Sequence, residues 1–336
     1  MKNRIGILGT GAYGIALAKM FLENNCNITM WTKFEEEANM LKTTRMNNNV
    51  LPNIYINQEI KITTNLEEVC QNNDILVICI PSLFVKETIE EVKEYVNSET
   101  IFCMASKGID NKTGKFMTDL LLDYFDESKI TIISGPSFAI DMVSYQPTGL
   151  SIAGSNEEST DLVIKNLSNK YLKVIQTNDV IGVSVCGSIK NVMAIASGML
   201  SGFNANPSCN AMFLTEAMHD IKTLIKKLGG NDRTIMSYAG IGDLLLTCTS
   251  SKSRNFTFGY NLVTKSYDEV LKYRHSTTIE GLDTLEAMKV LLKNKHIEMP
   301  IINVIDDIIN NKKNPEALLD YLMNKSNEET KEFVGN

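Results

Sequence analysis

A glycine-rich loop near the amino terminus constrains the fold of this chain more than any other feature. Gly9, Gly11 and Gly14 follow an apolar run at residues 5–8 and precede residues 15–22, where apolar side chains recur with helical spacing. GxGxxG is a weak pattern alone, but between a strand and a helix it is typical of a dinucleotide-binding turn. Its glycines allow the tight turn, the close approach of a pyrophosphate and the packing of helix on sheet. The sequence therefore predicts a dinucleotide on the free N–H groups that open this helix.

Short apolar runs alternate with helical patterns through the first half of the chain. Residues 15–22 and 85–95 have helical spacing, and they lie between strand-like runs. These runs are residues 5–8, 28–32, 75–80, 100–105 and 130–134, with 149–154 and 172–176 expected to extend the same sheet. The alternation predicts βαβ units, and therefore a parallel sheet with helices on both faces.

The second half of the chain has a different pattern. After about residue 178, strand-like runs disappear and long helical patterns follow at residues 180–200, 211–228, 280–295 and 302–311. We therefore expect an α/β Rossmann-type dinucleotide-binding domain over residues 1–179. An all-helical, substrate-binding domain is expected over residues 180–336.

Composition excludes several classes of protein. The 336 residues carry 33 Lys and Arg against 40 Asp and Glu, a net charge of −7 that argues against a nucleic-acid partner. Seven cysteines without a CxxC pair indicate reduced thiols. We see no signal-peptide core and no apolar run near the ~20 residues that span a bilayer, so we expect a cytoplasmic protein without a membrane span. The three histidines form no metal-binding pattern, so no metal is expected.

The residues after the second predicted strand bear on the choice of cofactor. An Asp or Glu at this point would bind the ribose 2′-hydroxyl of NAD and repel the 2′-phosphate of NADP. The chain instead has Thr32, Lys33 and Phe34, with no acid before Glu35. Lys33 could attract a 2′-phosphate, or it could be an ordinary solvated loop lysine. The sequence thus permits NADPH and leaves the preference between NADH and NADPH open.

Two motifs follow predicted strands. Lys107 lies in Ser-Lys-Gly after residues 100–105, and Ser137 lies in the Ser-Gly-Pro-Ser-Phe-Ala segment at residues 134–139. Ligands of doubly wound sheets bind beyond the carboxyl ends of the strands, so both motifs are candidates for the site. Taken alone, each is equally compatible with a plain surface turn.

Two further motifs lie in the helical half. Lys190 occurs in an apolar helical run with small residues, and burying an ammonium is costly unless it is paired or used. Asp243 follows Gly240 and Gly242 at an expected helix start. The tripeptide Ser-Arg-Asn at residues 253–255 then supplies a hydroxyl, an amide and a guanidinium, the group best suited to phosphate recognition. We expect these side chains to serve catalysis and anion binding.

In this order and spacing the motifs, completed by Ile-Glu-Gly at residues 279–281, resemble the bacterial NAD(P)-dependent glycerol-3-phosphate dehydrogenases over essentially the whole chain. The resemblance implies reversible reduction of dihydroxyacetone phosphate to sn-glycerol 3-phosphate, a precursor for phospholipid synthesis. It also implies NAD or NADP as the cofactor, a small phosphorylated substrate and a homodimer.

The resemblance further implies roles for individual residues. Lys190 would be the general acid that protonates the ketone oxygen as hydride arrives. The implied substrate-binding residues are Lys107, Gly135, Ser137, Lys190, Asp243, Ser253, Arg254 and Asn255. The implied cofactor-binding residues are Gly9, Gly11, Ala12, Tyr13, Gly14, Lys33, Lys107, Ala139, Arg254 and Glu280.

One segment departs from the family pattern. Where the family usually carries a stretch like GDNTRAALITRG, residues 206–217 place Asn210 and Glu216 at the basic positions. Such charge changes could weaken phosphate affinity or alter the substrate. Another small phosphorylated or carboxylated ketone therefore stays open as an alternative substrate, and a catalytically silent NAD(P)-binding regulator is a third reading.

Overall fold

The computed structural model describes residues 2–71 and 73–325, which form two compact units. The first unit comprises Met1–Lys107 and Lys115–Ser184, and the second comprises Gly108–Gly114 and Val185–Asn336. The second unit thus includes a seven-residue excursion from the first half of the chain, which the sequence patterns did not reveal. Each unit is described by itself below.

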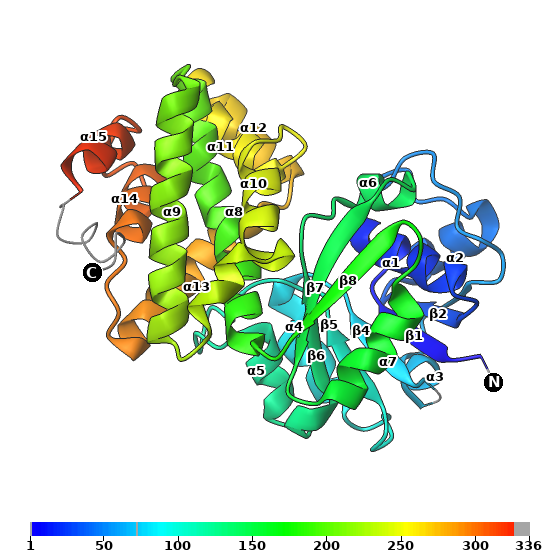
Figure 1. Ribbon diagram of the computed structural model, residues 1–336. Coiled ribbons are helices and arrows are strands. Elements are labelled where there is room, and N and C mark those ends of the chain that lie inside the picture. Colours follow the sequence, from blue (N-terminus) through cyan, green and yellow to red (C-terminus); the bar gives the residue numbers. More distant parts are fainter. Residues whose placement is uncertain (1, 72, 326–336) are drawn as a thin grey trace. The chain divides into compact units, whose positions relative to one another are not determined.

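The first unit is built on one eight-stranded sheet in the order β3-β2-β1-β4-β5-β6-β7-β8 (Figure 1). The strands are β1 (Arg4–Leu8), β2 (Asn27–Trp31), β3 (Lys61–Thr63), β4 (Ile75–Ile78), β5 (Ile101–Met104), β6 (Ile130–Ser134), β7 (Thr148–Gly154) and β8 (Leu172–Thr177). The strand order turns back between β1 and β4, which pair in parallel. In such sheets this switch point, beyond the carboxyl ends of the strands, is where ligands bind.

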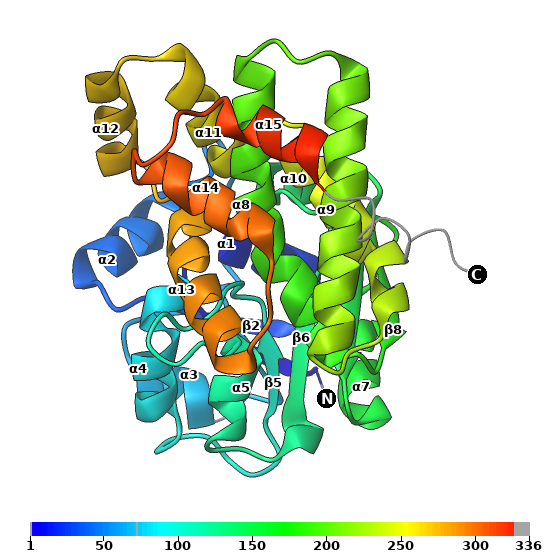
Figure 2. The ribbon, with the colours of Figure 1, turned by 90° about the vertical axis from the view of Figure 1, so that its left-hand side faces the viewer.

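Helices cover both faces of this sheet. They are α1 (Ala12–Glu23), α2 (Glu35–Thr44), α3 (Leu66–Gln71), α4 (Ser82–Val92), α5 (Met117–Leu122), α6 (Ala139–Val143) and α7 (Glu157–Leu167), with a 3-10 turn at Glu127–Lys129. Helix α1 contacts α6 and α7, whereas α4 contacts α3 and α5. Figure 2 shows α3, α4 and α5 together on one side of the strands and α7 on the other. The central strands, covered on both faces, are accordingly almost wholly apolar and buried.

The expected parallel sheet needs one correction. β6 and β7 pair antiparallel, with Ile133 opposite Ile152, whereas all the other pairs of strands are parallel. The connection between them contains only the five-residue α6. A helix of that length rises only about 7.5 Å, so it cannot carry the chain back along the sheet to start a parallel strand.

The second unit is helical. It contains most of α8 (Val180–Gly202), then α9 (Pro207–Lys227), α10 (Asp243–Cys248), α11 (Arg254–Thr264), α12 (Tyr267–Ser276), α13 (Glu280–Lys295), α14 (Pro300–Ile309) and α15 (Ala317–Asn324). A 3-10 turn at Asp232–Met236 and a π-helix at Tyr238–Gly242 precede α10. Among the described residues 185–325 no strand occurs. The predicted fold class, a Rossmann-type half followed by a helical half, is confirmed.

Helices α8 and α11 touch through their backbones. A Cβ atom on Gly198 of α8 would lie 2.0 Å from the Phe256 carbonyl oxygen. A Cβ on Gly259 of α11 would lie 1.9 Å from the Ile195 carbonyl oxygen. Real Cβ atoms do not approach so closely, so the crossing requires glycine on both helices. It fixes the distance between α8, which carries Lys190, and α11, which begins at Arg254.

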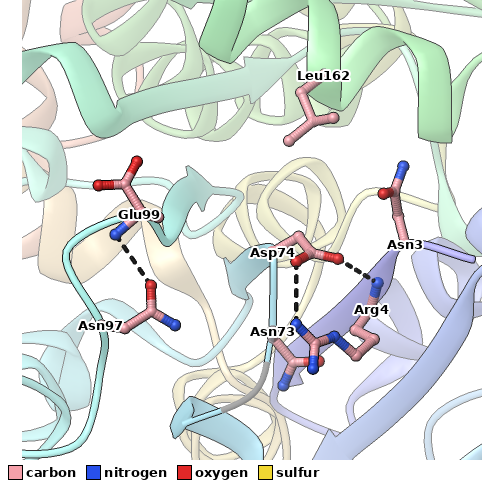
Figure 3. A pocket seen from close by; sticks show the side chains of 7 residues that line it. All are labelled: Asn3, Arg4, Asn73, Asp74, Asn97, Glu99 and Leu162. Carbon is pink, nitrogen blue, oxygen red and sulfur yellow. Dashed lines mark hydrogen bonds and ion pairs between the residues drawn. The ribbon is translucent and has the colours of Figure 1, made fainter. Parts of the chain in front are cut away.

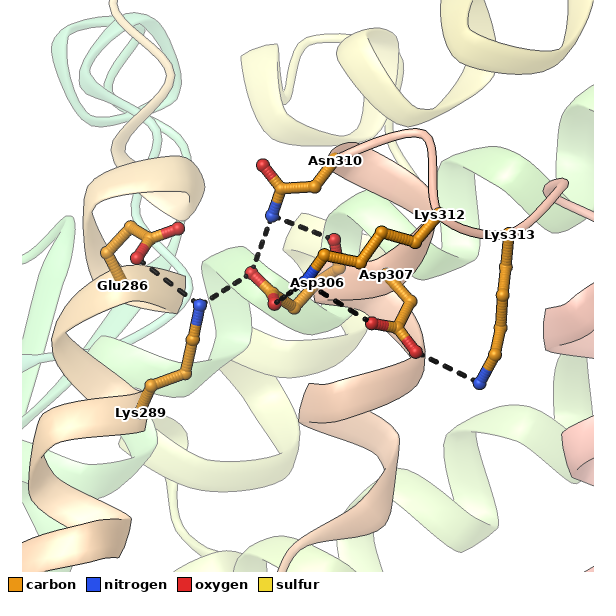
Figure 4. A network of polar contacts seen from close by, with 7 residues as sticks. All are labelled: Glu286, Lys289, Asp306, Asp307, Asn310, Lys312 and Lys313. Carbon is orange, nitrogen blue, oxygen red and sulfur yellow. Dashed lines mark hydrogen bonds and ion pairs between the residues drawn. The ribbon is translucent and has the colours of Figure 1, made fainter.

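Helices α13 and α14 are joined by a polar network around Asp306 (Figure 4). This carboxylate is buried, and it accepts hydrogen bonds from Lys289 Nζ at 3.0 Å and Asn310 Nδ2 at 2.9 Å. The hydrogen bond to Asp306 is the main reason why the pKa of Lys289 is raised. Because buried charges are costly unless paired, this network stabilises the contact between the two helices.

Helix α8 bears on the expectation that the protein has no membrane span. Its 23 residues are long and apolar enough to cross a membrane by composition alone, although the sequence indicated no such run. Within the most apolar window of this helix, 89% of the residues are buried inside the protein. Among the described residues no other helix passes the same test. Such burial is what the core helix of a folded domain shows, since a helix that is apolar all round must be covered.

Candidate active site

The glycine loop has the geometry that a dinucleotide requires. Gly9 has a φ of +121°, and a Cβ there would lie 2.3 Å from the Cys79 carbonyl oxygen. A Cβ on Gly14 would lie 2.4 Å from the Gly9 carbonyl oxygen, whereas one on Gly11 would meet nothing within 4 Å. Two of the glycines thus serve packing, and the third leaves open space beside the backbone.

The start of α1 supplies the matching electrostatics. Gly11 is the N-cap residue, no side chain caps the helix, and its first turn holds no acidic residue. The first N–H groups of a helix have no partner inside the helix and lie at the positive end of its dipole. An anionic pyrophosphate fits this combination of open space and free donors.

Several predicted residues gather beyond the carboxyl ends of β1, β5 and β6. The Tyr13 hydroxyl and Ser137 Oγ lie 3.0 Å apart, and Ser137 Oγ also donates to the Gly135 carbonyl oxygen at 3.0 Å. Lys107 Nζ lies 5.9 Å from the centroid of the Tyr13 ring. Ala139 is the first residue of α6. The first unit therefore brings together Tyr13, Lys107 and Ser137, which follow three separate strands and were predicted to bind substrate or cofactor.

Lys33 is not a free cation. Its Nζ lies 2.9 Å from Glu87 Oε1 on α4, and both side chains are exposed. This hydrogen bond, followed by the Coulomb attraction of Glu87, raises the pKa of Lys33. The lysine that left NADPH open in the sequence is therefore paired with a carboxylate at the surface.

In the second unit Lys190 and Asp243 form a buried ion pair. Lys190 is 8% exposed and Asp243 1% exposed, and Lys190 Nζ donates to Asp243 Oδ1. Thr247 Oγ1 donates to the Asp243 carbonyl oxygen at 2.6 Å and lies 3.5 Å from Asp243 Oδ1. The expectation that Lys190 is no solvated lysine is confirmed, and its partner keeps the charge tolerable in the interior.

A π-helix places Asp243. Residues Tyr238–Gly242 form one π turn, within which Gly240 has the non-helical angles φ −85° and ψ −106°. A Cβ on Gly240 would lie 2.1 Å from the Ile235 carbonyl oxygen, so only glycine fits. Helix α10 then begins at Asp243, as expected from the two glycines before it. Single π turns of this kind occur frequently at functional sites.

The starts of α11 and α13 lie against the middle of α8. Asn255, 7% exposed, accepts a hydrogen bond at its Oδ1 from the Gly281 N–H at 2.9 Å. Glu280 Oε2 accepts from Asn191 Nδ2 at 3.2 Å, and Glu280 Oε1 lies 3.9 Å from Arg254 Nη2. The Asn255 oxygen is thus occupied, which leaves the NH₂ group of its amide to donate elsewhere.

Ser253 also has a structural role. Its Oγ accepts a hydrogen bond from the Phe256 N–H at 3.2 Å and so caps α11. The hydroxyl hydrogen can still donate to a ligand. Asn191 and Thr247 also make contacts here, but neither was among the site residues predicted from the sequence. Their only signal in the sequence was that they lie close to Lys190 and to Asp243.

The segment that departs from the family pattern belongs to a different contact. Glu216 and Asp220 on α9 both pair with Lys325, at 2.9 Å and 2.7 Å, just beyond the end of α15. The Lys325 side chain is only 6% exposed. Asn210 Oδ1 is buried without a hydrogen-bond partner. The carboxylate of Glu216 therefore holds the end of α15.

One pocket lies away from this chemistry (Figure 3). It lies at the amino ends of β1, β4 and β5, the edge of the sheet opposite to the glycine loop. The pocket is lined by Asn3, Arg4, Asn73, Asp74, Asn97, Glu99 and Leu162. Arg4 and Asp74 within it already satisfy one another, with Arg4 Nη2 at 3.3 Å from Asp74 Oδ1. Ligands of doubly wound sheets bind at the carboxyl edge, so this pocket is not the cofactor site.

A Rossmann-type unit with an open glycine loop, followed by a helical unit with a buried lysine–aspartate pair, defines a nicotinamide-dependent oxidoreductase. The profiles of the two halves of NAD-dependent glycerol-3-phosphate dehydrogenase match this chain, the N-terminal one at residues 4–160 and the C-terminal one at residues 179–320. The chain belongs to this family, and the predicted resemblance is confirmed.

Individual relatives agree with this assignment. A glycerol-3-phosphate dehydrogenase [NAD(P)+] of Fusobacterium nucleatum is 33% identical over 324 residues, 95% of this chain and 96% of the relative. One from Staphylococcus haemolyticus is 32% identical and covers 91% of this chain and 93% of its own length. The crystal structure of the Coxiella burnetii glycerol-3-phosphate dehydrogenase superposes with a TM-score of 0.91 at 27% identity, covering 96% of this chain and 99% of that one. The chain is thus an NAD(P)-dependent enzyme with a small-molecule substrate.

Proposed function

We propose that this enzyme catalyses the reversible, NAD(P)H-dependent reduction of dihydroxyacetone phosphate to sn-glycerol 3-phosphate and so supplies phospholipid synthesis. The observation that carries the proposal is the buried pair of Lys190 and Asp243, with a guanidinium and an amide at the start of α11 in the same unit. The names and coverage of the relatives support this substrate.

The chemistry assigned to Lys190 is proton transfer. When bound, the reduced nicotinamide supplies a hydride to the carbonyl carbon of the substrate. The π electrons of the carbonyl then collect on its oxygen, and Lys190 Nζ donates a proton there and becomes neutral. A lysine is ordinarily protonated at neutral pH, so it is ready to act as the acid. In the reverse direction the neutral amine accepts the proton of the alcohol.

Other residues of the second unit would orient the substrate. Asp243 holds the ammonium of Lys190 in one position before the reaction, which lowers the reorganisation that the transition state needs. Arg254 and Asn255 are assigned to the substrate phosphate, because guanidinium and amide N–H groups match its oxygens. Ser253 adds a hydroxyl donor beside them. Asn191 supports this set through its hydrogen bond to Glu280.

The first unit would hold the cofactor and part of the substrate. The pyrophosphate is assigned to the backbone of the glycine loop and the start of α1, the segment containing Gly9, Gly11, Ala12, Tyr13 and Gly14. Further cofactor contacts are assigned to Lys33, Lys107 and Ala139 of this unit and to Arg254 and Glu280 of the second unit. The substrate contacts of this unit are assigned to Lys107, Gly135 and Ser137.

A direct assay tests the proposal. Purified protein is mixed with dihydroxyacetone phosphate and NADH or NADPH, and loss of the reduced-nicotinamide absorbance is followed. Unphosphorylated dihydroxyacetone is the matched control, and we expect it to react far more slowly because it cannot use Arg254 and Asn255. Absence of turnover with both cofactors would overturn the proposal. Faster turnover of another phosphorylated or carboxylated ketone would favour the alternative substrate.

The proposal includes a cytoplasmic homodimer. None of the seven cysteines, all within the described residues, forms a disulfide, as a reducing compartment would leave them. Burial raises the pKa of Cys70 and Cys103 to about 12, so these two thiols stay protonated and unreactive. The dimer rests on the family resemblance, and light scattering that gives the mass of one chain would contradict it.

A further inference from the structure

The end of β2 has an acidic side chain that the sequence did not place there. Glu37, the third residue of α2, turns back toward the strand, and its Oε2 accepts a hydrogen bond from Thr32 Oγ1 at 2.5 Å. Thr32 directly follows β2 and is buried. The strand-end position that has no acid in the sequence is therefore supplied with one from the following helix.

Asn47 ties the same carboxylate to the glycine loop. Its Nδ2 lies 3.1 Å from Glu37 Oε1 and 3.4 Å from the carbonyl oxygen of Thr10. Asn47 and Thr10 are 2% and 3% exposed, so these contacts lie in a packed interior. Glu37 is thus fixed between the end of β2 and the glycine loop, where dinucleotide-binding folds hold the adenosine ribose.

The carboxylate retains capacity to bind a ligand. An ionised carboxylate offers about four lone-pair sites, and the contacts with Thr32 and Asn47 use two of them. The Glu37 side chain is partly exposed. A ribose hydroxyl can donate to the free positions, whereas a 2′-phosphate has only acceptor oxygens and negative charge to offer.

The neighbouring charges oppose a phosphate as well. Glu35, Glu36 and Glu37 form the first turn of α2, and Lys33 beside them pairs with Glu87. Both members of that ion pair are about 60% exposed, 59% and 61%, so it is weak and competes with solvent. Lys33 therefore shares its charge with Glu87 in a weak surface pair, and of these three carboxylates Glu37 is the one held at the strand end by Thr32 and Asn47.

We propose that Glu37, held by Thr32 and Asn47, selects NAD(H) over NADP(H) in this enzyme. The proposal rests on the assignment of a nicotinamide dinucleotide to the glycine loop in the proposed function. Glu37 is a specificity-determining residue: it receives the 2′-hydroxyl of the adenosine ribose and repels a phosphate there. It resolves the question that Lys33 left open in the sequence.

Binding measurements test this without relying on catalysis. The dissociation constants of NADH and NADPH are measured by titration of nicotinamide fluorescence for the full chain, for Glu37→Gln and for Glu36→Gln. Glu36 is the matched control: it has the same charge in the same helical turn, so the comparison separates the placement of Glu37 by Thr32 and Asn47 from the general repulsion of a phosphate by nearby carboxylates. We expect the full chain to bind NADH at least about tenfold more tightly than NADPH. Glu37→Gln should shrink that ratio about tenfold, mainly by improving the binding of NADPH, while Glu36→Gln leaves it within about twofold.

Three results would overturn the proposal: equal or tighter binding of NADPH by the unaltered chain, an unchanged ratio in Glu37→Gln, or an equal change in Glu36→Gln. The first measurement needs no variant, so poor folding of Glu37→Gln cannot hide the answer. A parallel assay with dihydroxyacetone phosphate separates the two proposals. Selective NADH binding without turnover would refute the proposed function alone, and turnover that prefers NADPH would refute the role of Glu37 alone.

Discussion

The glycine loop of the first unit and the lysine–aspartate pair of the second prepare charged sites by different means. The loop presents backbone N–H groups, and its selectivity lies in the absence of side chains at Gly9, Gly11 and Gly14. The pair presents side-chain charges that are buried and mutually compensated, at Lys190 and Asp243. A backbone site fails when atoms are added, whereas a side-chain site fails when atoms are removed. Enlarging a glycine should therefore disrupt the site in the first unit, whereas truncating a charged side chain should disrupt the site in the second unit.

The largest effect is expected from the second unit. Lys190→Ala should lower kcat by about 10²–10⁴-fold, the range supplied by a general acid. The dissociation constant of NADH should stay unchanged, because Lys190 is not among the residues assigned to the cofactor. Steady-state kinetics and a fluorescence titration measure the two quantities on the same sample.

A companion variant controls for folding. Lys190→Ala leaves the Asp243 carboxylate buried without its main partner, which is itself destabilising. The double variant Lys190→Ala with Asp243→Asn removes both charges and should be equally inactive but closer to normal stability. Retained turnover in either variant would contradict the assignment of proton transfer to Lys190. Loss of NADH binding with the fold intact would contradict the assignment of cofactor binding to the glycine loop.

The second prediction contrasts two glycines of the loop. Gly14→Ala places a methyl group 2.4 Å from the Gly9 carbonyl oxygen and should destabilise the protein by about 3 kcal/mol. Gly11→Ala meets no protein atom within 4 Å, so it should cost under about 1 kcal/mol. It should still weaken NADH binding at least tenfold, ~1.4 kcal/mol, since the methyl group occupies the open space beside the pyrophosphate. Denaturant unfolding and NADH titration would show whether stability and binding separate in this way.

The third prediction concerns a side-chain contact without a catalytic role. Lys325→Ala removes the partner of Glu216 and Asp220 and leaves two carboxylates close together. We expect a loss of about 3 kcal/mol in unfolding free energy, with kcat little changed. Lys313→Ala is the control, because Lys313 pairs with Asp307 at the surface and should cost about 0.5 kcal/mol or less. Equal effects of the two substitutions would show that α15 is not anchored by Lys325.

The smallest effect is a pH dependence at the same contact. Burial, which outweighs the hydrogen bond to Lys325, raises the pKa of Asp220 above its usual value of 3.8. The folded state therefore binds this proton more tightly than the unfolded state, and stability falls as pH rises through the raised pKa. The stability of the unaltered protein relative to Asp220→Asn should decrease over that acidic range. A difference that grows with pH would contradict the assigned direction.

The sequence predicted those parts of the molecule that depend on local patterns. Strand and helix alternation located the sheet, and α13 was predicted with its observed bounds, Glu280–Lys295. Lys190 was predicted to be paired or used in catalysis, because it lies on an apolar helix where an unpaired ammonium would be costly. The antiparallel pairing of β6 with β7 was not predicted, because the spacing of apolar residues does not show in which direction a strand runs.

Long-range contacts account for what the sequence could not predict. The salt bridge between Lys33 and Glu87 joins residues 54 positions apart, so no local sequence pattern around Lys33 predicts it. An acidic residue that selects NAD would be expected directly at the end of β2, and Glu37 lies five residues after Thr32. Its side chain reaches the strand end only because it turns back to contact Thr32. The partner of Glu216 is Lys325, just beyond the end of α15 and far in the sequence from the segment in which the charge change was noticed.

The excursion at residues 108–114 limits how modular this protein can be. The chain crosses between the units at 107/108, at 114/115 and at 184/185, so no single cut separates them. Ser188 Oγ donates to the Gly108 carbonyl oxygen, and Asn294 Nδ2 donates to that of Thr113, which makes the excursion an integral part of the helical unit. A gene fragment ending at residue 184 would carry this piece away from its partners. An exchange of the helical unit with that of a relative would therefore have to include residues 108–114 as well as the carboxy-terminal half.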